Sequence, residues 1–327
     1  MYSQSNVPQD RLPALDGWRG LAITLVLIQH FFPWPLAMDT GRFGVDVFFC
    51  LSGLLMSNIL FVRRTNLAKF YKRRASRILP VFLLFTTLIF IVSWVDSGTF
   101  LLDEFIPTLL FLRTYLPVSP SIWSSSLPIG HFWSLNVEEH CYLVLGLLAL
   151  FIARRIWAAI SLGAISLLSI GILLAYVKFP HLAPASGTLG TECVAANLMI
   201  SASYCLVCKR LTGSIAPWTP ILALGLAACC YLESVPWWLS ILVAPLLLAF
   251  AVNHLIDLPT SVRKLFEWPP LRYFGIWSYS IYIWQQPFYA HRGTIGYGSA
   301  LLLAFLVAMI SYYWIESPVR NWLNKNW

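Results

Sequence analysis

The sequence places an imidazole inside a long apolar stretch. The segment LAITLVLIQHFFPWPLAM runs from Leu21 to Met38 and carries His30 past its middle. A charged group deep in a membrane span costs about 2.5–3.5 kcal/mol, so ionisable residues there usually face a polar cavity or mark a site. His30 could act as a general base toward a hydroxyl, or a neutral imidazole could simply bond a neighbouring backbone carbonyl. This segment alone leaves both interpretations open.

Two charged residues lie just before this stretch, at Asp16 and Arg19. Arg19 lies 11 residues before His30. At about 100° per residue, this spacing puts both side chains on nearly the same face of a helix. Asp16 lies three residues before Arg19 and can pair with it. We therefore expect one stripe of a first helix to run from an ion pair at its inner end to His30, lining a cleft that opens to the cytoplasm.

A second stretch, FYKRRASRILP, gathers guanidinium groups. Arg74 and Arg77 are three residues apart, so on a helix they project from one side as a pair of forks suited to phosphate oxygens. Arg73 lies beside them, and no acidic residue occurs between Arg63 and Arg77. The cluster suits a cytosolic anion with several phosphates or lipid head groups, and the spacing does not distinguish the two.

A third stretch, GHFWSLNVEEHCYLV, carries carboxylates. Glu138 and Glu139 lie near the start of an expected helix, where the helix dipole favours negative charge, so they could serve as capping groups. His131 shares a face with Glu138, and Trp133 is suited to anchor the membrane interface. In a functional interpretation, one carboxylate reaches the cavity of His30 from the outer side and orients the imidazole or an incoming hydroxyl.

The composition places these residues in an integral membrane protein. Of the 327 residues, 58% are hydrophobic and only 11% are charged, unlike an ordinary soluble domain. About 20 apolar residues in a helix cross a hydrocarbon core of about 30 Å. The stretches long enough lie at roughly 21–37, 44–62, 78–95, 137–153, 156–176, 190–208, 217–232, 236–254, 272–291 and 298–315. Segment 101–116 is short and interrupted by Asp103, Glu104 and Pro107, so we expect an interfacial or re-entrant piece.

The distribution of basic residues orients this bundle, because Lys and Arg in short loops favour the cytoplasmic side. With the N-terminus inside, only four of the 22 basic residues fall outside, namely Arg42, Arg113, Lys178 and Arg292. We expect an all-α integral membrane protein, a bundle of about ten transmembrane helices with both termini cytoplasmic. Residues 1–327 would form one transmembrane domain without a separate soluble domain.

Charge and cysteine content exclude several other classes. An inner basic surface that meets anionic lipid explains the net charge of +8, so nucleic acid is not expected as a partner. The seven cysteines lie within or at the ends of the expected spans and indicate no disulfide framework. The six histidines are scattered without the spacing of metal ligands, so we expect no metal site.

Six blocks of the sequence carry a family resemblance. They are LPALDGWRGLAITLVLIQH, GRFGVDVFFCLSGLLM, FYKRRASRILP, HFWSLNVEEHCYLV, YSIYIWQQP and WIESPVRNW. In this order they resemble the signature blocks of the acyltransferase-3 family of bacterial membrane O-acyltransferases, from about Leu12 to Trp322. The resemblance implies ten transmembrane helices in the bacterial cytoplasmic membrane. It also implies transfer of an acyl group, usually acetyl from acetyl-coenzyme A, to hydroxyls of acceptors such as cell-surface glycans.

The resemblance also implies roles for individual residues. His30 is similar to the essential histidine of the first block, and Glu138 to the acidic residue of the fourth. The residues expected to bind acyl-coenzyme A are Arg19, Ser52, Arg73, Arg74 and Arg77. Supporting positions in the same blocks are Asp16, Asp46, Trp133, Ser134, Glu139, Tyr279, Tyr282 and Gln285. Gln285 stands where the family usually has histidine, and an amide takes no proton near neutral pH, which argues against a proton relay there.

Together these features give a mechanistic hypothesis. The arginines hold acyl-coenzyme A, a co-substrate rather than a permanently bound cofactor, and its pantetheine arm threads between the first three helices. An acceptor hydroxyl enters from outside past Glu138. His30 removes the hydroxyl proton as the oxygen attacks the thioester, and Glu138 stabilises the imidazolium.

Two alternatives remain from the sequence. The chain could be a proton-coupled transporter or a flippase of a lipid-linked sugar, with His30 and acidic residues relaying protons through alternating access. It could also be an inactive scaffold in polysaccharide assembly. The sequence does not determine the acceptor, the acyl chain length, the use of an acyl-enzyme intermediate or the oligomeric state.

Overall fold

The structure, a computed structural model, describes residues 13–32, 37–184, 187–211 and 215–327. Within these ranges the chain is helical, and the only strand-like pairing is an isolated bridge between Met38 and Leu232. The expected all-α fold is therefore confirmed. The N-terminal residues 1–12, expected inside the cell, and residues 33–36 near the end of the first expected span lie outside the described residues.

The helices differ widely in length. The longer ones are α1 (Pro13–Phe31), α2 (Thr40–Ser57), α3 (Leu67–Ser97), α5 (Phe132–Phe151), α6 (Arg155–Lys178), α8 (Ala196–Leu211), α13 (Pro269–Ala290) and α15 (Tyr297–Ser311). The shorter ones are α4 (Leu102–Leu109), α7 (Thr191–Val194), α9 (Thr219–Cys229), α10 (Trp238–Leu242), α11 (Ala244–Asn253), α12 (Thr260–Phe266), α14 (Arg292–Ile295) and α16 (Ser317–Asn326). Wider helical turns at Asn58–Val62 and Tyr312–Glu316 continue α2 and join α15 to α16.

Among the described residues, five helical runs are long and apolar enough to cross a membrane. They are Thr40–Val62, Leu67–Ser97, Phe132–Phe151, Arg155–Lys178 and Tyr297–Asn326. Helices α8, α9 and α11 supply shorter apolar segments. Segment 101–116 contains only the eight-residue α4, as expected from its charges and proline. The count of ten spans stays a prediction.

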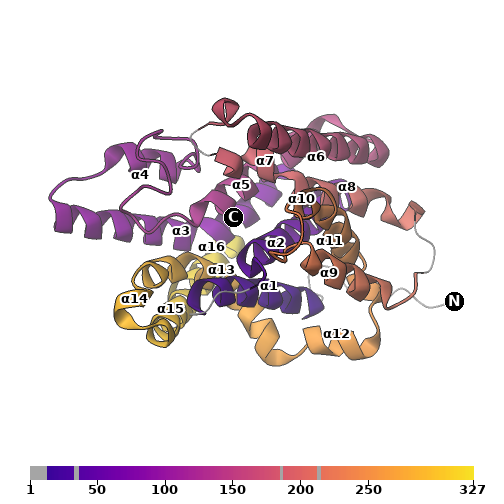
Figure 1. The fold of residues 1–327 in the computed structure, drawn as a ribbon. Coiled ribbons are helices and arrows are strands. Elements are labelled where there is room, and N and C mark those ends of the chain that lie inside the picture. Colours follow the sequence, from indigo (N-terminus) through magenta and orange to yellow (C-terminus); the bar gives the residue numbers. More distant parts are fainter. Residues whose placement is uncertain (1–12, 33–36, 185–186, 212–214) are drawn as a thin grey trace.

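The helices pack around α1 and α2. Helix α1 lies between α2 and α13, and α13 packs against α15, while α2 packs against α8, which in turn contacts α6 and α11 (Figure 1). Figure 1 also shows α3 and α4 extending to the left, away from this central group. Helices α1, α2 and α13, which carry several of the predicted site residues, therefore lie together in this central group.

Glycines bring α1 and α13 into backbone contact. A Cβ atom on Gly275 of α13 would overlap the carbonyl oxygen of Asp16, and one on Gly20 of α1 would overlap the carbonyl oxygen of Leu271. Small residues allow this close approach between helices in membranes. Because neither backbone can shift freely, these contacts fix the register of α1 against α13.

Adding a methyl group at this contact should destabilise the bundle. We expect Gly275→Ala to lower the free energy of unfolding by about 1–3 kcal/mol, the usual cost of overpacking a tight core. Gly171→Ala in α6 is the matched control, because a Cβ there meets nothing within 4 Å. Thermal unfolding in detergent compares the two variants, and equal midpoints would contradict the close contact.

Candidate functional site

Three cavities lie in a row beside α1. The arginine cavity, about 210 Å³, is lined by Arg19, Arg73, Arg74 and Arg77 among others. The central cavity, about 80 Å³, shares Arg19 and Arg77 with it. The histidine cavity, about 280 Å³, contains His30 and shares Val45 and Tyr282 with the central cavity. The shared lining residues make the three cavities neighbours along one path through the bundle.

Three of the four arginines that line the arginine cavity form no ion pair among the described residues. Helix α3, which begins after Asn66 caps the amides of Ala68 and Lys69, supplies Arg73, Arg74 and Arg77. Across the described ranges, none of the three forms an ion pair. Unpaired guanidinium groups at a cavity suit the oxygens of a phosphorylated ligand.

Local contacts hold these guanidinium groups in place. Arg74 lies 4.3 Å above the ring of Tyr142, an arrangement that attracts a cation to the ring face. The Nε atom of Arg74 also lies 3.1 Å from Sδ of Met56. Arg19 forms the ion pair with Asp16 that the spacing predicts, at 3.7 Å. Tyr142 and Met56 thus orient Arg74, and Asp16 orients Arg19.

The central cavity is built around Glu138 of α5. Ser52 of α2 donates a hydrogen bond to Oε1 of Glu138 at 2.5 Å, and the Tyr142 hydroxyl donates to the same oxygen. Tyr279 and Tyr282 of α13 complete the lining. At about 80 Å³ this cavity is smaller than the arginine and histidine cavities on either side of it.

The histidine cavity presents an imidazole with one nitrogen engaged. Nδ1 of His30 lies 3.1 Å from the amide oxygen of Gln285, and the Tyr289 ring lies against the imidazole with centroids 4.4 Å apart. An amide oxygen only accepts hydrogen bonds, so in this arrangement Nδ1 carries the proton and Nε2 has a free lone pair. The geometry therefore leaves Nε2 of His30 able to accept a proton.

Arg19 and His30 line different cavities. Arg19 lines the arginine and central cavities, whereas His30, in the last turn of α1, lines the histidine cavity. The structure does correct the expectation that Glu138 orients the imidazole. Its carboxylate lines the central cavity and bonds Ser52 and Tyr142, whereas Gln285 contacts His30.

The histidine cavity also contains residues that the sequence analysis did not assign to it. Asp39, which caps α2 by accepting from the Arg42 amide at 2.9 Å, lines this cavity. His131 also lines it, and neither ring nitrogen has a hydrogen-bond partner among the described residues. The hydroxyl of Tyr282 donates to the His131 carbonyl at 2.8 Å and holds this part of the chain. The sequence predicted that His131 and Glu138 share one face of a helix. It did not predict that His131 lies near His30.

The remaining predicted residues fall in different surroundings. Trp133 lines the histidine cavity, and Ser134 lines the central cavity, where it bonds Tyr282 at 2.5 Å. Asp46 accepts hydrogen bonds from Arg42 and Tyr231 beside a fourth cavity. Glu139 lines none of the three cavities in the row.

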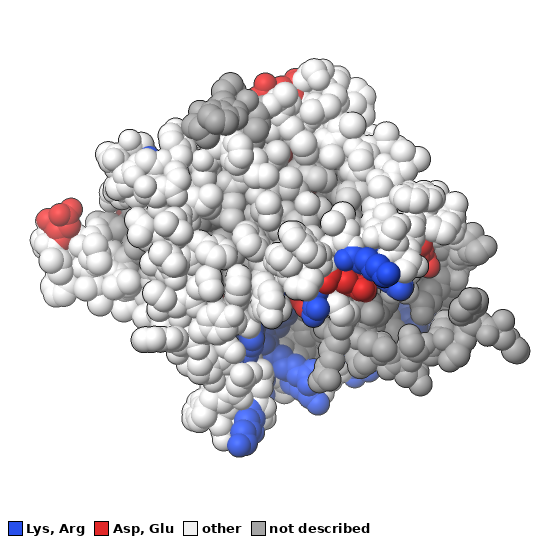
Figure 2. All heavy atoms as spheres, turned by 90° about the horizontal axis from the view of Figure 1, so that it is seen from below, with Lys and Arg blue, Asp and Glu red and all other residues white. Residues whose placement is uncertain are grey.

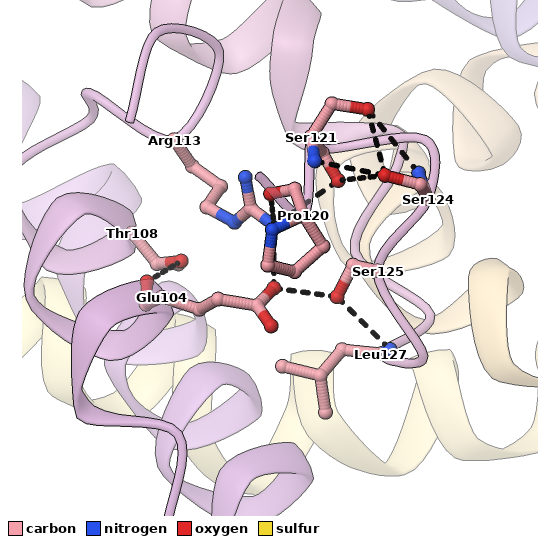
Figure 3. Close-up of polar contacts among 8 residues, drawn as sticks. All are labelled: Glu104, Thr108, Arg113, Pro120, Ser121, Ser124, Ser125 and Leu127. Carbon is pink, nitrogen blue, oxygen red and sulfur yellow. Dashed lines mark hydrogen bonds and ion pairs between the residues drawn. The ribbon is translucent and has the colours of Figure 1, made fainter. Parts of the chain in front are cut away.

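A buried ion pair organises the segment between α3 and α5. Arg113 and Glu104 point toward one another in Figure 3, and the Arg113 Nη2 group donates to Glu104 and to the carbonyls of Pro120 and Ser121. Ser125 donates to the same carboxylate at 2.5 Å. These bonds tie α4 to the following loop, which carries Trp123 to the histidine cavity.

Breaking this ion pair should loosen the whole segment. Arg113 is 1% exposed and Glu104 is 3% exposed, and removing one partner of a buried pair costs about 3–5 kcal/mol. We expect Arg113→Ala to lower the unfolding midpoint in detergent clearly, whereas Asp103→Ala, which removes an exposed neighbouring charge, should leave it nearly unchanged. An Arg113→Ala protein as stable as the native one would contradict this role.

A family model described as an acyltransferase domain, Acyl_transf_3, matches residues 12–315. The chain belongs to the acyltransferase-3 family. This match confirms the family that the six sequence blocks predicted. The cavities described above lie within the matched acyltransferase domain.

Curated relatives of this acyltransferase-3 chain align with 95% of it. YrhL of Bacillus subtilis strain 168, provisionally named a peptidoglycan O-acetyltransferase, is 28% identical. The O-acetyltransferase OatA of Staphylococcus aureus strain NCTC 8325 and the peptidoglycan O-acetyltransferase OatA of Listeria monocytogenes are each 25% identical. The chain spans only 55–57% of the length of these relatives. No solved structure matches it significantly.

Proposed function

We propose that this protein is a transmembrane O-acyltransferase that moves an acyl group, acetyl by default, from acyl-coenzyme A to a hydroxyl of a cell-envelope glycan. Family membership supports acyl transfer. The names of the relatives support an acetyl group and a peptidoglycan-like acceptor. The observation that carries the proposal is the row of cavities with unpaired arginines at one end and His30 at the other.

The proposal includes an orientation in the membrane. About ten spans in the bacterial inner membrane, with both termini cytoplasmic, would open the arginine cavity to the cytosol and the histidine cavity toward the outside. Figure 2 supports such a polarity, since Lys and Arg side chains gather toward the lower edge of the face shown, while most of its area carries no charge. A broad uncharged surface suits contact with lipid tails, and a basic edge suits the cytoplasmic leaflet.

The donor would lie along the row of cavities. Arg73, Arg74 and Arg77 would bind the phosphates of the coenzyme, while the slender pantetheine arm passes the central cavity. Glu138 would accept hydrogen bonds from the amide groups of this arm. This role replaces the one expected from the sequence, in which Glu138 orients His30. The thioester would then reach the histidine cavity without the nucleotide leaving the arginines.

The transfer step follows from the free nitrogen of His30. Nε2 would remove the proton of the acceptor hydroxyl as its oxygen attacks the thioester carbonyl, a general-base contribution of about 10²–10⁴ in rate. The new C–O bond replaces the C–S bond, and the coenzyme thiolate leaves and takes up a proton. Gln285 holds the Nδ1 proton throughout.

The arginine pair offers the first test. We expect coenzyme A and acetyl-coenzyme A to bind saturably to the purified protein, and Arg74→Ala/Arg77→Ala to weaken this binding at least about tenfold, because charge-assisted bonds contribute about 1.5–3 kcal/mol each. Isothermal titration in detergent measures the affinity.

A second double variant controls for the loss of charge. Lys69→Ala/Lys72→Ala also removes two positive charges from α3, but neither lysine lines the arginine cavity, so its affinity should stay near that of the native protein. If neither coenzyme binds to the native protein, the acyl-donor assignment fails and a carrier of a lipid-linked sugar becomes the better account.

His30 tests the chemistry separately from donor binding. His30→Ala should reduce coenzyme A release from acetyl-coenzyme A, with isolated peptidoglycan as acceptor, by about 10²–10⁴. Its affinity for coenzyme A should be retained, because the arginine cavity is intact. The exposed His181 supplies a control, since His181→Ala should keep full activity. Unchanged turnover in His30→Ala would rule out the general base.

A further inference from the structure

One buried tyrosine of α5 contacts a polar residue of each of two neighbouring cavities. Tyr142 is 1% exposed and is not part of the lining of either cavity. Its ring lies beneath the guanidinium group of Arg74, which lines the arginine cavity. Its hydroxyl donates to Oε1 of Glu138, which lines the central cavity. Tyr142 therefore connects a cation of one cavity with a carboxylate of the next.

Helix α3 fixes the position of this tyrosine. The ring of Phe70 meets the Tyr142 ring edge-on, with centroids 6.3 Å apart. The hydroxyl of Tyr71 donates to the Tyr142 carbonyl at 3.3 Å. Arg74 follows Phe70 by about one helical turn and covers the face of the Tyr142 ring at 4.3 Å. The helix that supplies the cavity arginines therefore also decides where the Tyr142 hydroxyl lies.

That hydroxyl holds one oxygen of the Glu138 carboxylate. Oε1 accepts from Tyr142 and, at 2.5 Å, from Ser52. No residue in the described part of the chain donates to Oε2, and Glu138 is only half-buried where it lines the central cavity. A carboxylate has acceptor capacity on both oxygens, so holding Oε1 leaves Oε2 for a donor group that enters this cavity.

We propose that Tyr142 is a positioning residue that makes the protein select donors with a pantetheine arm. This inference rests on the proposed function, in which the arginines bind the phosphates of the coenzyme and Glu138 accepts from the amides of the arm. The ring of Tyr142 orients Arg74 for the phosphates, and its hydroxyl orients Glu138 for the arm. Tyr142 itself touches neither part of the donor, but it sets the spacing between two groups that do.

Two ligands test the two ends of Tyr142 separately. Coenzyme A carries phosphates and the arm, whereas ADP carries the adenosine and the diphosphate without the arm. We expect Tyr142→Phe to weaken coenzyme A binding about three- to tenfold, the usual effect of losing one neutral hydrogen bond. Its affinity for ADP should stay native, because the ring beneath Arg74 remains. Isothermal titration in detergent measures both affinities, and a change of one oxygen atom preserves the packing.

Three further variants separate positioning from a general loss of structure. Tyr71→Phe removes a hydroxyl that bonds the Tyr142 carbonyl rather than Glu138, so it should keep native affinity for coenzyme A. Tyr142→Leu also removes the ring and should weaken the binding of both ligands. In a Glu138→Ala background, Tyr142→Phe should have no further effect on coenzyme A binding, because residues that act through one another are not additive.

Several results would overturn this role. They are native coenzyme A affinity in Tyr142→Phe, an equal loss of both ligands in that variant, the same loss in Tyr71→Phe, and a full further loss in the Glu138→Ala background. Each of these rejects the role of Tyr142 and leaves the arginine site standing. Absent binding of coenzyme A by the native protein would instead reject the proposed acyl donor and, with it, this role.

Discussion

The backbone contact between α1 and α13 is the constraint on which the site depends. Gly20 and Gly275 bring the two helices so close that neither can slide or rotate without overlap. Helix α1 carries Arg19 in its first half and His30 in its last turn, and α13 carries Tyr279, Tyr282 and Gln285. One fixed register therefore decides both that Gln285 meets His30 and that two tyrosines close the central cavity.

Polar groups inside an apolar bundle must face one another or a cavity, because desolvation is costly. Helix α2 illustrates this rule along its length. Ser52 contacts Glu138 in the central cavity, Asp46 lines the fourth cavity of about 460 Å³, and Arg42 lines both that cavity and the histidine cavity. The polar side chains of one helix thus connect the proposed path of the donor with the proposed place of the acceptor.

The segment between α3 and α5 shows how a polar cluster can replace an apolar core. Glu104 and Arg113 are buried together, and backbone carbonyls of the facing loop accept from the same guanidinium group (Figure 3). Asp103 and Glu104 in the sequence indicated only an interrupted helix. The fold uses Glu104 to fix a loop that presents Trp123 to the histidine cavity.

The sequence by itself determined the features that depend on composition and on spacing within one helix. These are the all-helical membrane character, the family, the ion pair of Asp16 and Arg19, and the position of Arg74 and Arg77 on the same helix. Helical periodicity fixes such neighbours wherever the helix lies. It does not fix how far a side chain lies from a partner on another helix.

Only the tertiary structure decided which residues share a cavity. Gln285 contacts His30 across 255 residues of sequence, and Ser52 contacts Glu138 across 86. The sequence assigned Glu138 to the imidazole because both residue types suit acid–base chemistry. The register of the helices instead places Glu138 in the central cavity, since the positions of small residues, rather than the chemistry of the polar ones, determine where two helices touch.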